Sequence, residues 1–599
     1  MRKTKKFAAI VLSALILSST FSVLPVSAAS IESHNQAVSY QVIKTKDFMY
    51  SILDNQNIKI EKYIGNDKTV VIPDTIEDKS VTIIAEDAFC NCSNIEKITI
   101  PDSVNEIGDY AFYGCSSLND ISIPNSVTNI GKSAFQGCSN LTDISIPDSV
   151  NNIESNTFEG CTSLVTVSLP NNLTAINECT FYNCTNLKNI SIPNSVNKIG
   201  DWAFSDCSNL KNISIPNSVN KIGDYAFYYC SNINDISIPN SVTNIGKSAF
   251  QNCSSLVSVS LSDKIVSISE STFQGCSNLI NISIPEGVSF INLAAFKDCS
   301  NLSNISIPDS VTTIDIRAFY ECSNLKSVKL SNNLKNIGED AFRGCSSLDS
   351  IVIPDSVTTI DIRAFFGCSN LKSVKLSNNL TNIDEFLFSG CSSLKDITIP
   401  NSVKNISDYA FKSCENLNTI VIGNNVETIG NCAFALCENL KNVKISNSVK
   451  SIGTAAFRDC DNLIHITILE NVSDIGEYAF GYYSLYNEEN DNFDNVKYNN
   501  YKIYGYKNTA AETYAKENGF EFISLGEQIL TGDANQDGTV NIKDVTYLQM
   551  HIAGNKTTDG SPLINETNKQ LFDSIDMNND GKLTVNDVTA LQTYLTQNN

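Results

Sequence analysis

The chain has 599 residues, with 65 Asp and Glu against 42 Lys and Arg, a formal net charge of −23 and a pI of about 4.6. Because this balance gives no cationic footprint, we exclude nucleic acid and anionic membrane surfaces as partners. The length suggests several globular domains, but the sequence is internally repetitive, so the repeats decide the architecture.

The first residues predict a secretory signal peptide over residues 1–29. Met1 to Lys6 is basic, an apolar run follows from Phe7 to about Leu17, and small residues lead up to Ala29. The alternative is a membrane anchor, but the run is shorter than the roughly 20 residues that a bilayer requires. No later stretch is long and apolar enough to span. We therefore expect a secreted, extracellular protein without a membrane span.

Phe recurs every 23 residues over eighteen copies, from Phe89 to Phe480, without a slip. Ile precedes each Phe by five positions, and another aliphatic residue precedes it by eight. In one copy, Leu118 to Ile123 alternates like a strand, Pro124 ends it, and Gly131 permits a turn before the Phe fills a corner. One unit cannot bury its apolar side alone, so the copies must stack into a solenoid with a continuous core.

Seventeen of the 20 Cys stand three residues after a repeat Phe, from Cys92 to Cys460, and the others are Cys90, Cys179 and Cys432. An exported chain rich in Cys raises the alternative of disulfides. Equivalent side chains on stacked coils, however, point in parallel rather than toward each other. We therefore interpret the Cys residues as small buried fillers of the core.

The 23-residue unit resembles the BspA-like, Treponema-type leucine-rich repeats of bacterial surface proteins, over residues 81–483. Residues 30–80, with a Val-Val-Ile-Pro run at 70–73, resemble the N-terminal cap of that family. Residues 484–526 hold an acidic insertion and a segment that resembles its C-terminal cap, with a helix around 508–518. The resemblance implies a β-rich leucine-rich-repeat solenoid of about 18 coils with terminal caps.

The outward positions of the repeat contain two candidate ligand surfaces. The residue ten after each Phe is Thr or Ser in the first ten copies, but from Lys329 onward Lys375 and Lys444 are interspersed with Val352 and Val421. A solvated sheet face is the simpler interpretation of this row. Aromatic residues beside the repeat Phe could stack on sugars or anchor a partner, or could only cover a corner of the coil. This candidate patch comprises Tyr110, Tyr113, Tyr182, Trp202, Tyr225 and Tyr228.

Catalytic motifs are not apparent. His34, His465 and His551 are the three His residues, and no nucleophile-elbow, metal-hydrolase or phosphate-loop spacing appears. Acidic residues are abundant enough for a glycosidase-like pair. A strict repeat, however, leaves no irregular cleft in which two carboxyl pKa values would be pushed apart. We therefore expect a protein that is not an enzyme.

Two segments after Gly526 match a calcium-binding loop, the first over 533–544 and the second over 576–587. Each has oxygen ligands at positions 1, 3 and 5, Gly at position 6 for the sharp turn, and a carboxylate at position 12. Backbone carbonyls are expected at position 7. The sequence therefore predicts two calcium ions, with these ligands: Asp533, Asn535, Asp537, Thr539, Asp544, Asp576, Asn578, Asp580, Lys582 and Asp587.

Each loop leads into a short amphipathic helix, expected over 544–552 and 587–595. The first loop has no helix before it and both loops have Asp at position 12, so residues 527–599 resemble a type I dockerin. That resemblance implies calcium-dependent binding to a cohesin module of a scaffold protein, in a cellulosome-type, polysaccharide-degrading complex. The family's clostridial Ser/Thr pair is missing, which leaves the cohesin type open. Carried over by position, the cohesin contacts are Ile542, Lys543, Val585 and Asn586.

Three hypotheses follow. The first is a non-catalytic interaction protein, held on a scaffold by its dockerin, whose solenoid binds polysaccharide or a cell-surface protein. The second is a free cell-surface adhesin whose calcium module is only structural. The third is a polysaccharide-active enzyme component.

Overall fold

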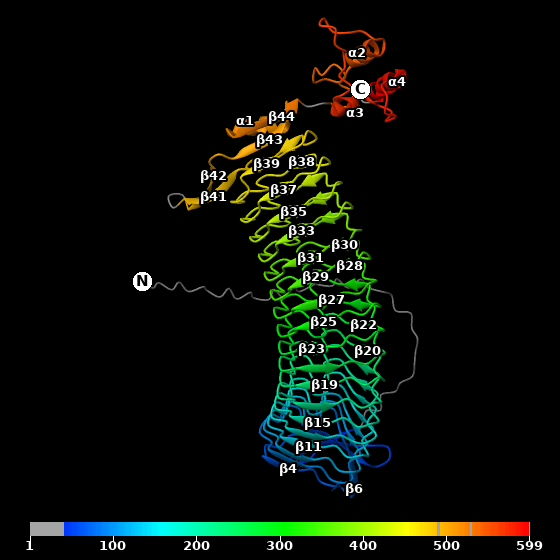
Figure 1. Ribbon diagram of the computed structural model, residues 1–599. Helices are drawn as coiled ribbons and strands as arrows, with labels where there is room; N and C mark the ends of the chain where they lie inside the picture. The colour runs from blue at the N-terminus through cyan, green and yellow to red at the C-terminus, as the bar shows by residue number, and fades with distance from the viewer. Residues whose placement is uncertain (1–40, 488–490, 528–529, 598–599) are drawn as a thin grey trace, which may run out of the picture. The chain divides into compact units, whose positions relative to one another are not determined.

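A computed structural model describes residues 41–487, 491–527 and 530–597. The predicted signal peptide, residues 1–29, and the start of the predicted N-terminal cap lie outside the described residues. The described chain is a long solenoid of stacked coils, followed by a small helical unit with its own core (Figure 1). This confirms the predicted fold class.

The first strands cover one end of the solenoid core. They pair antiparallel from β1 to β3, and β3 then pairs parallel with β6, which starts the parallel stack. The ring of Tyr63 stacks on Phe89 at 5.4 Å between centroids, so the cap supplies the ring that covers the first repeat Phe. The strands of this region are β1 (Val42–Lys44), β2 (Phe48–Ile52), β3 (Ile58–Tyr63), β4 (Thr69–Val71), β5 (Thr75–Ile76) and β6 (Lys79–Ile84).

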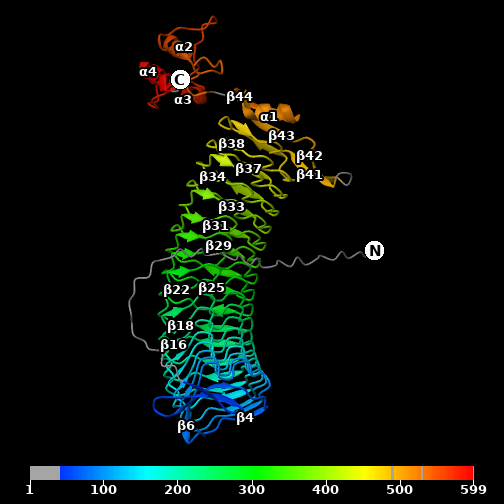
Figure 2. The ribbon, with the colours of Figure 1, turned by 180° about the vertical axis from the view of Figure 1, so that it is seen from behind.

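The repeat contributes two short strands per coil, and each pairs in parallel with its counterpart 23 residues away, as Asn129 pairs with Asn152. The two resulting rows run along the stack (Figures 1 and 2). The first row is β7 (Lys97–Thr99), β9 (Asp120–Ser122), β11 (Asp143–Ser145), β13 (Thr166–Ser168), β15 (Asn189–Ser191), β17 (Asn212–Ser214), β19 (Asp235–Ser237), β21 (Ser258–Ser260), β23 (Asn281–Ile282), β25 (Asn304–Ser306), β27 (Ser327–Lys329), β29 (Ser350–Val352), β31 (Ser373–Lys375), β33 (Asp396–Thr398), β35 (Thr419–Val421), β37 (Asn442–Lys444) and β39 (His465–Thr467).

The second row lies after the residue that ends each first strand, which is Pro or Ser in all copies except those with Gly423 and Leu469. The last residue of each second strand is the Ile five positions before the repeat Phe. It is β8 (Glu106–Ile107), β10 (Asn129–Ile130), β12 (Asn152–Ile153), β14 (Ala175–Ile176), β16 (Lys198–Ile199), β18 (Lys221–Ile222), β20 (Asn244–Ile245), β22 (Ser267–Ile268), β24 (Phe290–Ile291), β26 (Thr313–Ile314), β28 (Asn336–Ile337), β30 (Thr359–Ile360), β32 (Asn382–Ile383), β34 (Asn405–Ile406), β36 (Thr428–Ile429), β38 (Ser451–Ile452) and β40 (Asp474–Ile475).

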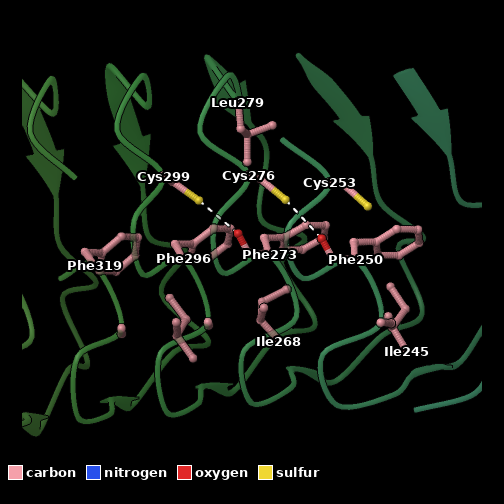
Figure 3. Packing of buried hydrophobic residues seen from close by; sticks show 14 of the residues in the cluster. Ile245, Phe250, Cys253, Ile268, Phe273, Cys276, Leu279, Phe296, Cys299 and Phe319 are labelled. Carbon is pink, nitrogen blue, oxygen red and sulfur yellow. Dashed lines mark hydrogen bonds between the residues drawn. The ribbon is translucent and has the colours of Figure 1, made fainter. Parts of the chain in front are cut away.

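The repeat Phe residues form one continuous stack inside the solenoid. Neighbouring rings lie 4.9 Å apart at the closest pair, Phe434 with Phe457, and 5.7 Å apart at the widest, Phe250 with Phe273. Figure 3 shows part of this stack with its flanking Ile and Leu side chains. Each ring is fully or almost fully buried, so every coil contributes a large apolar area to a core that only its neighbours complete.

The corner beside each Phe uses left-handed backbone, which the sequence pattern did not reveal. The residue two positions before the Phe has a positive φ in all eighteen copies, for example 58° at Trp202 and 53° at Ser248. Gly131 begins the turn before the Phe, as predicted: its carbonyl oxygen accepts from the backbone N–H of Ala134 at 3.3 Å. Its φ is not positive; instead, a Cβ there would lie 2.5 Å from the backbone nitrogen of Asp109, so Gly permits close approach of two coils.

The Cys ladder contains no disulfide among the described residues, and sixteen of its thiols are buried. This confirms the interpretation as core fillers and adds a polar role. Each thiol from Cys115 to Cys460 donates a hydrogen bond to the carbonyl oxygen of the Phe in the preceding coil, as Cys276 does to Phe250 at 3.2 Å (Figure 3). The thiols therefore fill space and also satisfy a buried carbonyl.

The last coil is covered by a strand-helix-strand segment. β43 pairs parallel with both β39 and β44, and the hydroxyl of Tyr514 donates to the carbonyl oxygen of Phe480 at 3.0 Å. The acidic insertion forms an antiparallel pair, β41 with β42. The elements are β41 (Tyr482–Asn487), β42 (Asn492–Lys497), β43 (Lys502–Lys507), α1 (Ala510–Asn518) and β44 (Glu521–Glu527).

The helical unit contains α2 (Ile542–Ile552), α3 (Lys569–Ile575) and α4 (Val585–Gln597). α2 and α4 pack together around Val545, Leu548, Val588 and Leu591, all buried. Among the helices of the described residues, none has the length and apolar character needed to cross a bilayer.

Candidate calcium loops and docking surface

The first loop folds around the two carboxylates at its ends. Asp533 accepts hydrogen bonds from the backbone N–H groups of Asp537 at 3.1 Å and Gly538 at 2.9 Å. Asp544 accepts from the backbone N–H groups of Asn535 at 3.2 Å and Asn541 at 2.7 Å. Both end carboxylates therefore fix the course of the backbone between them.

The second loop repeats this arrangement almost atom for atom. Asp576 accepts from the backbone N–H groups of Asp580 at 3.2 Å and Gly581 at 2.8 Å. Asp587 accepts from the backbone N–H groups of Asn578 at 3.3 Å and Thr584 at 2.8 Å. Two loops 43 residues apart in sequence thus have one geometry.

The sharp turn of each loop depends on two residues with left-handed backbone, two positions apart. Gly538 has a φ of 82° and Gly581 a φ of 77°, a region that favours Gly. Two residues earlier, Gln536 and Asn579 are also left-handed, at 58° and 54°. This turn carries the side chains at positions 3 and 5 to the open side of the loop, where Asp537 and Asp580 are exposed.

Four buried carboxylates make these loops suited to a divalent cation. Asp533, Asp544, Asp576 and Asp587 are each at most 7% exposed. Ionised carboxylates buried at this level need a positive charge as well as hydrogen bonds. Three carboxylates, an Asn amide oxygen and a backbone carbonyl per loop are the oxygen donors that calcium prefers. Among the described residues, no group of three His, Cys, Asp or Glu side chains is gathered closely enough to hold a metal ion, so the three carboxylates of each loop do not converge on one point in this structure.

The helices begin two residues earlier than expected, at Ile542 and Val585 rather than at position 12 of each loop. A capping box explains the first start: the Asn541 side chain accepts from the backbone N–H of Lys543 at 2.9 Å, while Asp544 accepts from that of Asn541. Position 12 therefore serves both the loop and the helix start.

The residues assigned to cohesin contact lie on the first turn of each helix, in solvent. Ile542 is 65% exposed and Val585 is 67% exposed, while the adjacent Lys543 and Asn586 are also exposed. Two large aliphatic side chains in equivalent positions, outside a core that holds Val545 and Val588, are unusual on a small polar unit.

The aromatic patch is divided by the structure into two groups. Trp202 stacks on Tyr225 at 4.0 Å between centroids, and Tyr182 and Tyr228 meet Trp202 edge-on. Tyr229, which follows Tyr228 in the same coil, packs on Tyr228. Tyr110 and Tyr113 form a separate pair, at 6.0 Å. Because Trp202 and Tyr225 cover one face of each other, only part of each ring is available to a ligand.

Two carboxyl groups in the solenoid, those of Asp361 and Asp384, have raised pKa values, which bears on the expectation that no pair of carboxyl pKa values is pushed apart. Burial is the main cause at Asp361 and at Asp384, and neighbouring acidic groups add to it. Both pKa values move in the same direction, however, whereas a glycosidase-like pair needs them to move apart.

One buried acidic residue was not foreseen. Asp340 is 1% exposed and pairs with Arg317 and Arg343, each at 3.3 Å, and with Arg363 at 3.4 Å. The three Arg side chains come from consecutive coils, so this network ties them together. The repeat spacing contained a signal for this network. Arg317, Asp340 and Arg363 stand 23 residues apart, each two positions before a repeat Phe, so they lie side by side on neighbouring coils.

Comparisons with known proteins match both parts of the chain. The model of the BspA type leucine rich repeat region matches residues 59–188, 174–303, 244–372, 291–418 and 404–505. The model of the dockerin type I domain matches residues 531–596. The search of curated proteins gives no match.

Solved structures similar to this chain include three bacterial leucine-rich repeat proteins. One from Bacteroides ovatus is 28% identical with a TM-score of 0.55, and the match covers 63% of this chain and 99% of that one. A leucine rich cell surface protein from Faecalibacterium prausnitzii is 28% identical over 68% and 95% of the two chains, with a TM-score of 0.33. One from Eubacterium ventriosum is 23% identical over 54% and 92%, with a TM-score of 0.31.

Proposed function

Because the chain belongs to the BspA-type leucine-rich repeat family and carries a type I dockerin domain, which implies a cohesin partner, we propose that it is a secreted, non-catalytic component of an extracellular polysaccharide-degrading complex. The dockerin holds it on a cohesin-bearing scaffold in a calcium-dependent way. The solenoid presents a binding surface to substrate or to a cell-surface protein.

The observation that carries this proposal is the duplicated loop. Both loops bury the carboxylates at positions 1 and 12 and direct that of position 5 to solvent, so each is suited to hold one Ca²⁺ through Asp533, Asn535, Asp537, Thr539 and Asp544 or their counterparts. With Ca²⁺ bound, the buried charges are compensated and the start of each helix is fixed. The exposed pairs Ile542–Lys543 and Val585–Asn586 then present a rigid contact to the cohesin.

Two observations favour this function over the alternatives. A module that served only as a structural clamp would have no need of exposed Ile542 and Val585 at equivalent positions. For an enzyme component, the solenoid offers a stack of near-identical coils, and its two carboxyl groups with raised pKa values, those of Asp361 and Asp384, move in the same direction. The aromatic cluster around Trp202 is retained as one candidate ligand surface of the solenoid.

The test is capture by immobilised cohesin modules in the presence of Ca²⁺. Asp537→Ala combined with Asp580→Ala should abolish capture, because each change removes a carboxylate from the open side of a loop. Asp559→Ala combined with Asp573→Ala is the matched control: both residues are exposed, lie outside the loops and remove the same charge. Equal capture of the two double variants would contradict the proposal.

A further inference from the structure

One face of the first strand row is cationic, although the chain as a whole is strongly acidic. Three strands of this row end in a lysine: β27 in Lys329, β31 in Lys375 and β37 in Lys444. All three side chains are exposed. At the sheet spacing of about 4.8 Å, Lys329 and Lys375 lie two strands, or about 10 Å, apart. Lys444 follows three strands later, about 14 Å further. From β7 to β25, by contrast, the last residue of each strand in the row is Thr, Ser or Ile.

Further lysines and few carboxylates surround these three. On this face, Lys372 forms an ion pair with Asp349 at 2.6 Å. Among the described residues, no carboxylate lies within 4.0 Å of the ammonium group of Lys329, Lys375 or Lys444. Asp309 and Asp355, at the edge of the face, act on Lys329 and Lys375 only at longer range. The other exposed charges of the face are Lys326, Lys395, Lys441 and Asp396.

Apolar side chains lie between the cations. Val352 is 59% exposed and Val421 is 51% exposed, on strands that alternate with those of the lysines. The register pairs Val352 with Lys375 and Val421 with Lys444. A ligand that lies along this row therefore meets cationic and apolar groups in turn.

The sheet opens into a hollow at Lys329. β27 pairs with β29 only through Ser327 and Ser350, whereas β29 pairs with β31 through all three residues. A hollow of about 520 Å³ beside these strands is lined by Lys329, Val352 and Lys375 among others. Seven coils earlier, a hollow of about 510 Å³ is lined by Ser168 and Ser191 at the positions of Lys329 and Val352. The two hollows therefore differ in chemistry more than in size.

From this face we propose that the strands from β27 to β37 bind an anionic, carboxylated polysaccharide of the polyuronate class. Regularly spaced carboxylates pair with the unpaired lysines, and the apolar faces of the sugar rings lie against Val352 and Val421. The choice of a polysaccharide rests on the proposed extracellular function, whereas the cationic face does not depend on the dockerin. A shallow, periodic row suits a linear polymer better than a globular partner, which usually needs buried aromatic or Arg anchors.

Affinity electrophoresis of the full chain tests this, with soluble polygalacturonate as the probe and dextran and poly-L-glutamate as comparators. EDTA is present throughout, so that the probe does not gel and the dockerin does not contribute. We expect retardation by polygalacturonate that weakens as salt is added, because exposed ion pairs are screened over about 10 Å at 0.1 M. Dextran should not retard the chain. Equal or stronger retardation by poly-L-glutamate would overturn the assignment to a polysaccharide.

Matched variants locate the site. K329Q, K375Q and K444Q together should weaken binding about tenfold at low salt. The control K198Q, K221Q and K335Q removes the same charge from β16, from β18 and from the residue before β28, and should leave binding unchanged. Adding S168K, S214K and S283K to the first triple variant rebuilds the row seven coils earlier and should restore binding. Equal loss in both triple variants, or no restoration, would contradict the proposal. Cohesin capture in Ca²⁺ is measured separately on the same variants. It shows whether the proposed scaffold binding also fails or only the polysaccharide binding does.

Discussion

Alkaline pH should destabilise the solenoid steeply, because its core contains protonated thiols. Burial raises the pKa of Cys115, Cys161 and Cys368 to about 12, and the pKa of the other buried thiols moves in the same direction. A thiol whose pKa is higher in the folded state keeps its proton when the unfolded chain has lost it. Its contribution to stability is therefore complete below about pH 9 and is lost as the pH rises toward the folded value.

The magnitude follows from the unfolded pKa of about 9. Between pH 8 and pH 10, each buried thiol lowers the free energy of unfolding by about 1.4 kcal/mol. For the sixteen buried thiols the sum is roughly 20 kcal/mol if the solenoid unfolds as one unit. At ~0.05–0.15 kcal/mol of net stability per residue, this is a large part of the stability of a solenoid of this length. We therefore expect the urea midpoint to fall steeply between pH 8 and pH 10, measured by urea titration with far-UV circular dichroism at each pH.

A triple variant isolates the thiols from other titrating groups. C253A, C276A and C299A should be less stable than the parent at pH 8, because three hydrogen bonds and some packing are lost. The fall in stability from pH 8 to pH 10 should nevertheless be smaller by about 4 kcal/mol. An identical fall in parent and variant would refute the reasoning, as would reaction of more than the four partly exposed thiols with Ellman's reagent in the native protein at pH 8.

Two further predictions concern the aromatic groups. Phe273→Ala should lower the free energy of unfolding by about 3–5 kcal/mol, since the ring is fully buried between two others, and a loss below 1 kcal/mol in urea titration would contradict the stacked core. Trp202 is the single Trp, so a neutral oligosaccharide that binds at the aromatic cluster should shift its emission, and Tyr225→Ala should remove the shift. Unchanged Trp202 emission at saturating sugar would contradict ligand binding here and would indicate that these rings only cover a corner of the coil.

Most of the fold could be predicted because the repeat constrains it so strongly. A register of Phe and Ile over eighteen copies, with Cys in seventeen of them, leaves stacking as the way to bury those side chains, and the spacing of Asp, Asn and Gly marks the two loops. The left-handed corners could not be predicted, since Trp, Tyr, Ser and Arg occupy them as well as Asn. These residues do not signal a positive φ, and the tertiary stack imposes it.

The two loops could be located from the sequence, but the starts of the helices that follow them could not, and the calcium ligands stay a prediction. The capping box that starts α2 at Ile542 combines Asn541 with a carboxylate already assigned to the loop, so its second role was not apparent. The hollow beside Lys329 was also out of reach. The Lys and Val residues that line it are visible in the repeat, but no residue type in the pattern marks a hollow there, and one of similar size lies seven coils earlier.

The most direct test of the central claim is to measure cohesin binding and solenoid structure on the same samples. The full chain is titrated with a cohesin by calorimetry in Ca²⁺ and again after EDTA, and far-UV circular dichroism is recorded for each. Chelation should abolish binding, because buried carboxylates without a cation destabilise the small helical unit. The spectrum, which the solenoid dominates, should stay nearly unchanged. Binding that persists in EDTA would contradict the account.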